Sequence, residues 1–275
     1  MADDIYEVFA ITYARHDRNA AANFIGGDPH DGPMPLNYYV WVIRNAARTI
    51  VVDTGFDRRG AEKRGRELLR PLPEALEALG IDQASVADVV ITHMHYDHCG
   101  NDGLFPNARF HLQDAEIAFA TGRCMCHEQM RHAYELDDVV AMVRRVFHGR
   151  VCFHQGTSEP FPGIELHHVG GHARGLQSLR VKTGRGFVCL ASDAAHHYAH
   201  LETRRVFPTV DSVSDVLEGY DKITRLASSP AHIVPGHDPL VASLYPAALP
   251  GTEAWIMRLD ASPSPSARTP SAQAR

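Results

Sequence analysis

The sequence lacks the features that mark nucleic-acid-binding and membrane-spanning proteins. Its 275 residues carry 27 basic against 33 acidic side chains, a formal net charge of −6, and no run of Lys or Arg stands out. A nucleic-acid partner needs a basic footprint, so the composition argues against one. No apolar stretch approaches the roughly 20 residues that a membrane span needs. We therefore expect neither nucleic acid nor a membrane among its partners.

Cysteine is scarce, and the chain begins without an export signal. The five Cys residues cannot all pair with one another, and residues 1–4 have neither the basic start nor the apolar core of a signal peptide. We expect reduced thiols and a cytoplasmic location. Cys124 and Cys126 lack the two-residue spacer and the second thiol pair of a zinc ribbon, so we interpret them as structural or incidental.

The length and composition favour one catalytic domain followed by a tail. A chain of 275 residues with 44% hydrophobic content suits a single sandwich domain with a full core. We place this domain at residues 1–250 and expect a monomer or a homodimer. Residues 251–275 are rich in Ser, Pro and Ala, a composition that buries too little surface to order itself. We therefore predict a disordered tail.

Four potential metal ligands lie within six residues, directly after an apolar run. The run covers residues 86–91, and the following loop contains His93, His95, Asp97 and His98. Residues two apart in an extended chain point the same way, so the first two histidines can reach one ion. A turn into a helix would carry the next pair to a second position close by. Imidazole nitrogen and carboxylate oxygen suit zinc, with iron, cobalt or manganese as alternatives.

The rest of the chain alternates strand and helix patterns. Strands are expected at residues 5–13, 38–43, 49–52, 108–112, 164–169, 176–181 and 186–190, and helices at 73–79 and 213–227. Periodicity alone supports a mixed α/β domain with considerable antiparallel pairing.

The ligand spacing His-x-His-x-Asp-His resembles the motif of the metallo-β-lactamase superfamily, in the form seen in its lactonase and glyoxalase II branches. That family completes a two-metal site with a distant His, a bridging Asp and a final His, each after a strand. The matching positions here, in the family's order, are His172, Asp193 and His237. The resemblance implies an α/β fold, the αβ/βα four-layer sandwich, with all seven ligands at one edge. It also implies that Asp53 is a buried carboxylate that orients ligating imidazoles.

Such a ligand set selects a reaction type. Two metal ions about 3.5–4 Å apart can share a water, lower its pKa and hold the hydroxide against a carbonyl. Hydrolysis of an ester, thioester, lactone or amide fits this chemistry.

Three further stretches narrow the resemblance to the N-acyl homoserine lactone lactonases and γ-butyrolactone hydrolases. They are residues 23–30, 191–196 and 234–239. The resemblance implies a dinuclear lactonase, a carboxylic ester hydrolase that opens a small-molecule lactone with a metal-bridging hydroxide and so quenches quorum signals. A glyoxalase II-like thioesterase and a lactonase of a catabolic pathway stay open as alternatives.

The sequence departs from the lactonase pattern beside the bridging Asp. Some lactonases place a Tyr three residues after it, where this chain has His196, with Tyr198 two residues further on. Either side chain can donate a hydrogen bond to a developing oxyanion, and together with Asp97 they are our candidate catalytic residues. Both are alternatively surface polar residues on a helix.

Residues 115–147 contain soft and aromatic side chains scattered among polar ones. Side chains of this kind line apolar grooves, and the acyl chain of a substrate would fit such a groove. They are alternatively part of the core.

Overall fold

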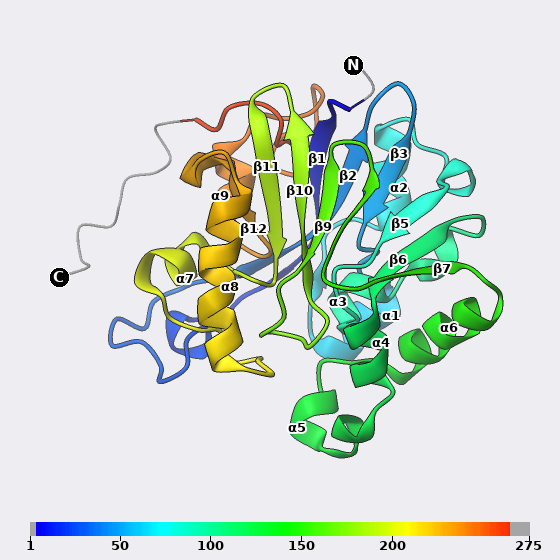
Figure 1. Cartoon of the computed structure of the whole chain (residues 1–275). Coiled ribbons are helices and arrows are strands. Elements are labelled where there is room, and N and C mark those ends of the chain that lie inside the picture. Colours follow the sequence, from blue (N-terminus) through cyan, green and yellow to red (C-terminus); the bar gives the residue numbers. More distant parts are fainter. Residues whose placement is uncertain (1–3, 265–275) are drawn as a thin grey trace.

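Two β-sheets packed face to face, with helices on both outer faces, form the architecture of this chain (Figure 1). The computed structural model describes residues 4–264. The first sheet contains β1 (Glu7–His16), β2 (Leu36–Arg44), β3 (Thr49–Val52), β4 (Glu67–Leu68), β5 (Asp88–Val90), β6 (Arg109–Gln113), β7 (Val151–His154) and β13 (Ile256–Arg258). The second contains β8 (Thr157–Phe161), β9 (Ile164–His168), β10 (Gln177–Thr183), β11 (Gly186–Ser192) and β12 (Ile233–Pro235).

The helices divide between the two outer faces. They are α1 (Arg58–Arg64), α2 (Leu72–Ala78), α3 (Tyr96–Cys99), α4 (Asp114–Ala120), α5 (Glu128–Arg131), α6 (Leu136–Phe147), α7 (Tyr198–Thr203), α8 (Val213–Leu226) and α9 (Leu240–Leu244). In Figure 1, α1, α2, α4 and α6 lie on the side of the first sheet, and α7, α8 and α9 lie on the side of the second. Within residues 4–264, no helix is both long and apolar enough to cross a membrane.

Three clusters of buried side chains explain the four layers. The first joins Leu76 of α2 and Met142 of α6 to the outer face of the first sheet. The second fills the space between the sheets, where Trp41 and Leu190 are completely buried. The third packs Ile223 of α8 against the second sheet. Each apolar face is thus covered, which gives the predicted α/β sandwich.

The strand and helix predictions hold for most of the domain. The predicted strands at 38–43 and 49–52 form the antiparallel pair β2–β3, and those at 176–181 and 186–190 form the antiparallel pair β10–β11. Helix α8 begins after Ser212, whose hydroxyl accepts a hydrogen bond from the backbone N–H of Asp215 at 3.3 Å. This is the N-cap geometry for which serine is preferred.

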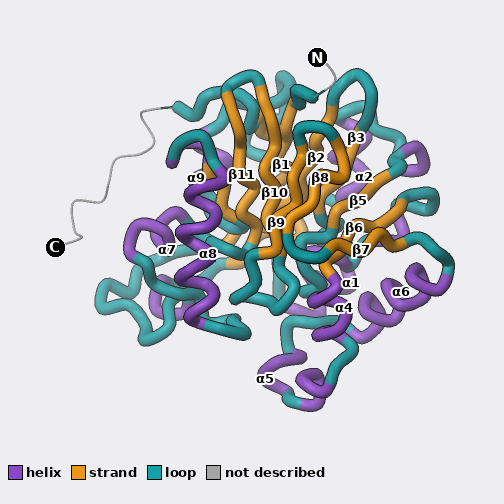
Figure 2. The backbone as a smooth tube through the Cα atoms, viewed as in Figure 1, coloured by secondary structure: helices purple, strands orange, loops and turns teal. Residues whose placement is uncertain are grey.

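The topology brings the carboxyl ends of several strands to one edge. Strands β3, β5 and β6 run parallel to one another in the first sheet, and β11 and β12 run parallel in the second. Figure 2 shows loops following the strand ends along this edge. The loops that contain His93, His172, Asp193 and His237 all follow such strand ends.

The predicted domain end at residue 250 is wrong, and so is the disordered tail as far as Ser264. Strand β13 pairs antiparallel with β1, and Ile256, Met257 and Leu259 are completely buried. The Ser/Pro-rich average of the segment hides three apolar residues that complete the edge of the first sheet. The remaining predicted tail, residues 265–275, lies outside the described residues.

Candidate metal centre

The loop after β5 changes conformation between its two ligand pairs. His93 and His95 lie in extended chain, with ψ of 154° at His95, and α3 begins at the next residue. This helical turn redirects Asp97 and His98. All four side chains are buried.

The candidate ligands form several overlapping groups that are compact enough to hold a metal ion, and two of these groups share no residue and leave Asp193 out. In the first, ligand atoms of His93, His95 and His172 lie within 4.8 Å of one another. In the second, ligand atoms of Asp97, His98 and His237 meet the same limit. Two further groups, His93 with His98 and Asp193, and His172 with Asp193 and His196, connect them.

Asp193 lies between the two groups and directs one carboxylate oxygen to each. Its Oδ2 atom is 3.2 Å from Nε2 of His172 and 3.9 Å from Nε2 of His93. Its Oδ1 atom is 3.3 Å from Nε2 of His98 and 3.0 Å from Nε2 of His237. The structure therefore brings all seven side chains that we predicted as ligands into one centre.

Several buried ligand atoms in this centre have no hydrogen-bond partner among residues 4–264. They are Nε2 of His93, Nε2 of His98 and Oδ1 of Asp193. Burying such atoms unpaired costs on the order of 1–3 kcal/mol each. A cation that accepts their lone pairs would remove this cost, and nitrogen and oxygen donors are those that zinc and related ions take. The residues thus fit a divalent metal ion.

Electrostatics favours the metal-binding protonation states of His93, His95 and Asp193. Burial holds the pKa of His93 and His95 well below 6.5, so both imidazoles are neutral. Burial opposes the charge of Asp193, but the surrounding histidines, His237 foremost, outweigh it and hold its pKa well below 3.8. Neutral imidazole and ionised carboxylate are the ligand forms. At His98 and His237 burial opposes the charged form, but the Asp193 carboxylate outweighs it and raises the pKa of both above 6.5, so a bound metal ion would replace a proton there.

A carboxylate behind the centre fixes the ligand loop. Asp53 accepts hydrogen bonds from the backbone N–H and the hydroxyl of Thr92 at 2.7 and 2.8 Å, and its Oδ2 lies 2.7 Å from Nδ1 of His98. Asp53 and Ser192 have φ of 62° and 48°, in the left-handed region that non-glycine residues rarely occupy. Such backbone strain concentrates at functional sites. The structure thus confirms that Asp53 contacts and orients a ligand.

Sequence reasoning missed a second buried carboxylate, Glu116. It accepts hydrogen bonds from the backbone N–H groups of Met94 and Gly175, both at 2.8 Å, and from the hydroxyl of Tyr134 at 3.0 Å. Glu116 therefore ties the loop of His93 to the loop of His172. A Cβ at Gly175 would lie 2.2 Å from the Glu116 nitrogen, so only glycine allows this approach. No sequence pattern marks a Glu in a helix as buried.

The two residues that we predicted near Asp193 lie in different environments. His196 lines the cavity above the ligands, with its Nε2 atom 3.2 Å from Oδ2 of Asp193. Its ring stacks on Phe207 at a centroid distance of 3.7 Å. Tyr198 is buried in the cluster between the sheets and is not among the residues that line this cavity. Both side chains are buried, so the alternative prediction that they are surface polar residues is wrong.

Two hollows open directly onto the ligands. The first, the metal pocket, is lined by Arg18, Leu36, Tyr38, Arg64, Arg66, Tyr96, Phe207 and Thr209 together with ligand side chains. The second, the apolar recess, is lined by Phe119, Met130, Pro208 and Val210 with several polar neighbours. His95 and His172 line both hollows.

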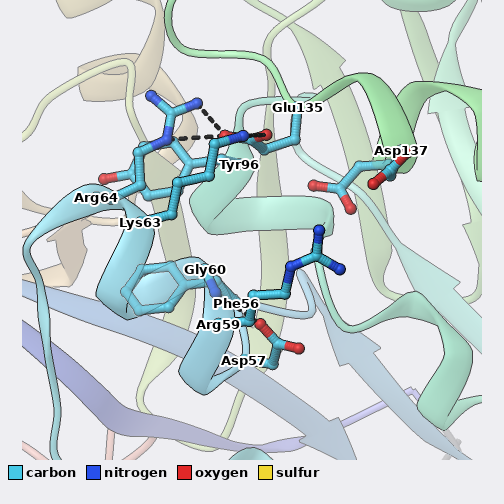
Figure 3. Close-up of a pocket in the computed structure, with 11 residues that line it drawn as sticks. Phe56, Asp57, Arg59, Gly60, Lys63, Arg64, Tyr96, Glu135 and Asp137 are labelled. Carbon is cyan, nitrogen blue, oxygen red and sulfur yellow. Dashed lines mark hydrogen bonds and ion pairs between the residues drawn. The ribbon is translucent and has the colours of Figure 1, made fainter.

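A third hollow shares Arg64 and Tyr96 with the metal pocket (Figure 3). There the side chains of Lys63 and Arg64 both bind the carboxylate of Glu135. Although Arg64 also lines the metal pocket, its guanidinium is engaged by this carboxylate, which it shares with Lys63.

Comparisons with known proteins agree with this geometry. A family model described as the metallo-beta-lactamase superfamily matches residues 33–237. A probable metallo-hydrolase of Mycobacterium tuberculosis is 26% identical over 230 residues, which is 74% of this chain and 71% of that protein. An N-acyl homoserine lactonase of Bacillus cereus is 26% identical over 194 residues, 64% of this chain and 72% of that one.

A solved structure of a quorum-quenching N-acyl homoserine lactone lactonase has the same fold. It superimposes with a TM-score of 0.72 at 21% identity, covering 86% of this chain and 94% of the other. The family match spans most of the chain and includes all seven candidate ligands. This chain therefore belongs to the metallo-β-lactamase superfamily.

Proposed function

We propose that the protein is a metal-dependent lactonase, which opens the ring of an N-acyl homoserine lactone or a related γ-lactone. One observation carries the proposal: Asp193 directs its two oxygens to two separate ligand groups. This arrangement suits a pair of divalent ions, with zinc as the first candidate. Relatives named N-acyl homoserine lactonase support the choice of a lactone among the possible substrates.

The ligand side chains can be assigned to two metal ions. His93, His95 and His172 would hold one, and Asp97, His98 and His237 the other, with Asp193 between them. Bound ions of this kind polarise a carbonyl oxygen and lower the pKa of a water between them.

Protein groups around the ions complete the proposed chemistry. Asp97 lines the metal pocket, and we assign this carboxylate to carry a proton toward the ring oxygen that leaves. His196 lines the same pocket, and burial holds its pKa well below 6.5, so it is a neutral hydrogen-bond donor. We assign it to the carbonyl oxygen as negative charge develops there. The deeper position of Tyr198 favours His196 for this role.

The apolar recess is the proposed site for an acyl chain. Phe119 and Met130 belong to the stretch that we proposed as a groove, and they line a hollow that reaches His95 and His172. Each buried methylene of a chain placed there would contribute about 0.8 kcal/mol at most. Catalytic efficiency should therefore rise with chain length until the recess is full.

A substrate panel tests the proposal. Metal-loaded protein is given N-acyl homoserine lactones of increasing chain length, γ-butyrolactone and S-lactoylglutathione, and acid release is followed with and without a chelator. We expect lactone opening that the chelator abolishes. Preference for the thioester would instead support the glyoxalase II alternative, and no hydrolysis of any lactone would overturn the proposal.

A further inference from the structure

Two arginine side chains in the metal pocket have no carboxylate partner. Arg18 and Arg66 both line the pocket and are half-buried. Within residues 4–264, neither forms an ion pair with Asp or Glu. Arg64 in the same pocket differs, because it binds the carboxylate of Glu135 together with Lys63 (Figure 3). The pocket thus presents two positive charges that the protein itself leaves unbalanced.

Arg66 lies one aromatic layer away from the second ligand group. Its Nε atom donates a hydrogen bond to the hydroxyl of Tyr96 at 3.1 Å. The oxygens of Tyr96 and Tyr38 are 3.2 Å apart, and the Tyr38 ring contacts the ring of His237 at a centroid distance of 5.1 Å. These contacts hold the guanidinium at the rim of the pocket.

Arg18 packs against a different aromatic side chain of the pocket wall. Its guanidinium carbon lies 5.1 Å from the centre of the Phe207 ring, and that ring stacks on His196 beside Asp193. Aromatic side chains therefore separate each arginine from the proposed metal centre: Tyr96 and Tyr38 for Arg66, and Phe207 for Arg18. A group attached directly to a lactone ring would lie within their reach.

The two arginines create a positive field at the pocket mouth, although the chain as a whole carries a net charge of −6. The pKa of His16 reflects this field. Burial lowers it most, and the positive charges of Arg66 and Arg18 lower it further, to about 4. A half-buried guanidinium gives up part of its hydration, and a bound carboxylate would restore the lost interactions through two parallel hydrogen bonds.

We infer that Arg18 and Arg66 form a subsite for a carboxylate carried by the substrate. The inference rests on the proposed lactonase function and narrows its substrate class from N-acyl homoserine lactones, which have no free carboxylate, to the related γ-lactones: the preferred lactone bears a free carboxylate close to its ring. Arginine suits this role because its planar fork matches carboxylate geometry and its charge is permanent.

A pair of substrates of equal size tests the subsite. Metal-loaded protein is assayed on γ-butyrolactone-γ-carboxylate and on the uncharged carboxamide of the same lactone. We expect kcat/KM to be at least about tenfold higher for the carboxylate, because charge-assisted hydrogen bonds distinguish the two. Added salt should lower this preference.

Substitutions then assign the preference to the two side chains. Arg18→Gln and Arg66→Gln should each lower kcat/KM for the carboxylate about tenfold, mainly through KM, and change that for the carboxamide less than about twofold. Arg15→Gln is the matched control, because Arg15 is exposed, hydrogen-bonds Asp17 and does not line the pocket. Equal losses on both substrates would overturn the subsite.

Binding separates this inference from the proposed reaction. The ring-opened diacid and its monoamide are titrated into the metal-loaded protein by calorimetry. Tighter binding of the diacid that both arginine variants lose would support the subsite even if no lactone were hydrolysed. Lactone hydrolysis without any preference for the charged substrate or the diacid would overturn the subsite and leave the lactonase function intact.

Discussion

The metal centre and the walls of the pocket above it are built in opposite ways. Ligands such as His93 and Asp193 follow strand ends directly, where the sheets fix their positions. Wall residues such as Arg18, Arg66 and Phe207 come from loops that are distant in sequence and meet only in the folded chain. The centre decides which bond is broken, and the walls decide which molecule is accepted.

The walls also differ from each other. One side presents the unpaired charges of Arg18 and Arg66, whereas the apolar recess presents Phe119 and Met130. A substrate that satisfies both would carry a negative group on one side of its lactone ring and an apolar group on the other. Changes in the centre should therefore affect every substrate equally, and changes in the walls should affect only some.

The largest effect is expected from the ligand that both groups share. Asp193→Ala removes both oxygens at the centre, and His172→Ala removes one imidazole. We expect each variant to lose bound metal and the hydrolysis of every lactone together, measured by elemental analysis and acid release. If Asp193→Ala retained activity, the claim that this carboxylate serves both ligand groups during hydrolysis would be wrong.

A smaller effect is expected at His196, which belongs to both regions. If it donates to the developing oxyanion, His196→Ala should lower kcat about 10²–10³-fold on all lactones and leave metal content unchanged. Tyr198→Phe is the comparison, and it should change kcat little because Tyr198 is packed between the sheets. Loss of metal from His196→Ala would show instead that this side chain holds Asp193 in place.

A selective effect is expected in the apolar recess. Met130→Ala should reduce kcat/KM several-fold for long-chain acyl homoserine lactones and leave γ-butyrolactone unaffected, because only a chain reaches this side. Leu136→Ala is the control, since Leu136 is 75% exposed and does not line the recess. An equal loss of kcat/KM on the long-chain lactones and on γ-butyrolactone would show that Met130 does not select for the acyl chain.

The smallest effect on turnover is expected from a truncation that touches neither region. Deleting residues 251–275 removes β13 and with it the buried Ile256 and Met257. Burial of such side chains is worth about 1.5–3 kcal/mol each, so the melting temperature should fall by roughly 10 °C or more. We expect kcat of the folded fraction at low temperature to stay close to that of the full chain. An unchanged melting temperature would mean that β13 adds no stability.

The sequence predicts the metal centre well because its signals are local. The four ligands of residues 93–98 are neighbours in the chain, and His172, Asp193 and His237 each follow a recognisable strand. The sequence leaves open whether the chain turns into a helix after His95, and α3 shows that it does.

Other features depend on contacts that no local pattern encodes. The burial of Glu116 and the unpaired state of Arg18 and Arg66 arise from segments that meet only in the folded chain. The error at β13 has a related cause. The average composition of residues 251–275 conceals a three-residue strand whose order comes from pairing with β1.

The central claim is that two divalent ions, held by the ligand groups on either side of Asp193, drive the opening of a lactone. Metal content and lactone hydrolysis measured on one preparation, before chelation, after chelation and after metal is returned, test it most directly. We predict close to two ions per chain, loss of hydrolysis when they are removed and recovery when they are restored. Full hydrolysis with one ion or none would contradict the two-metal centre, and a fully loaded protein that opens no lactone would contradict the proposed reaction.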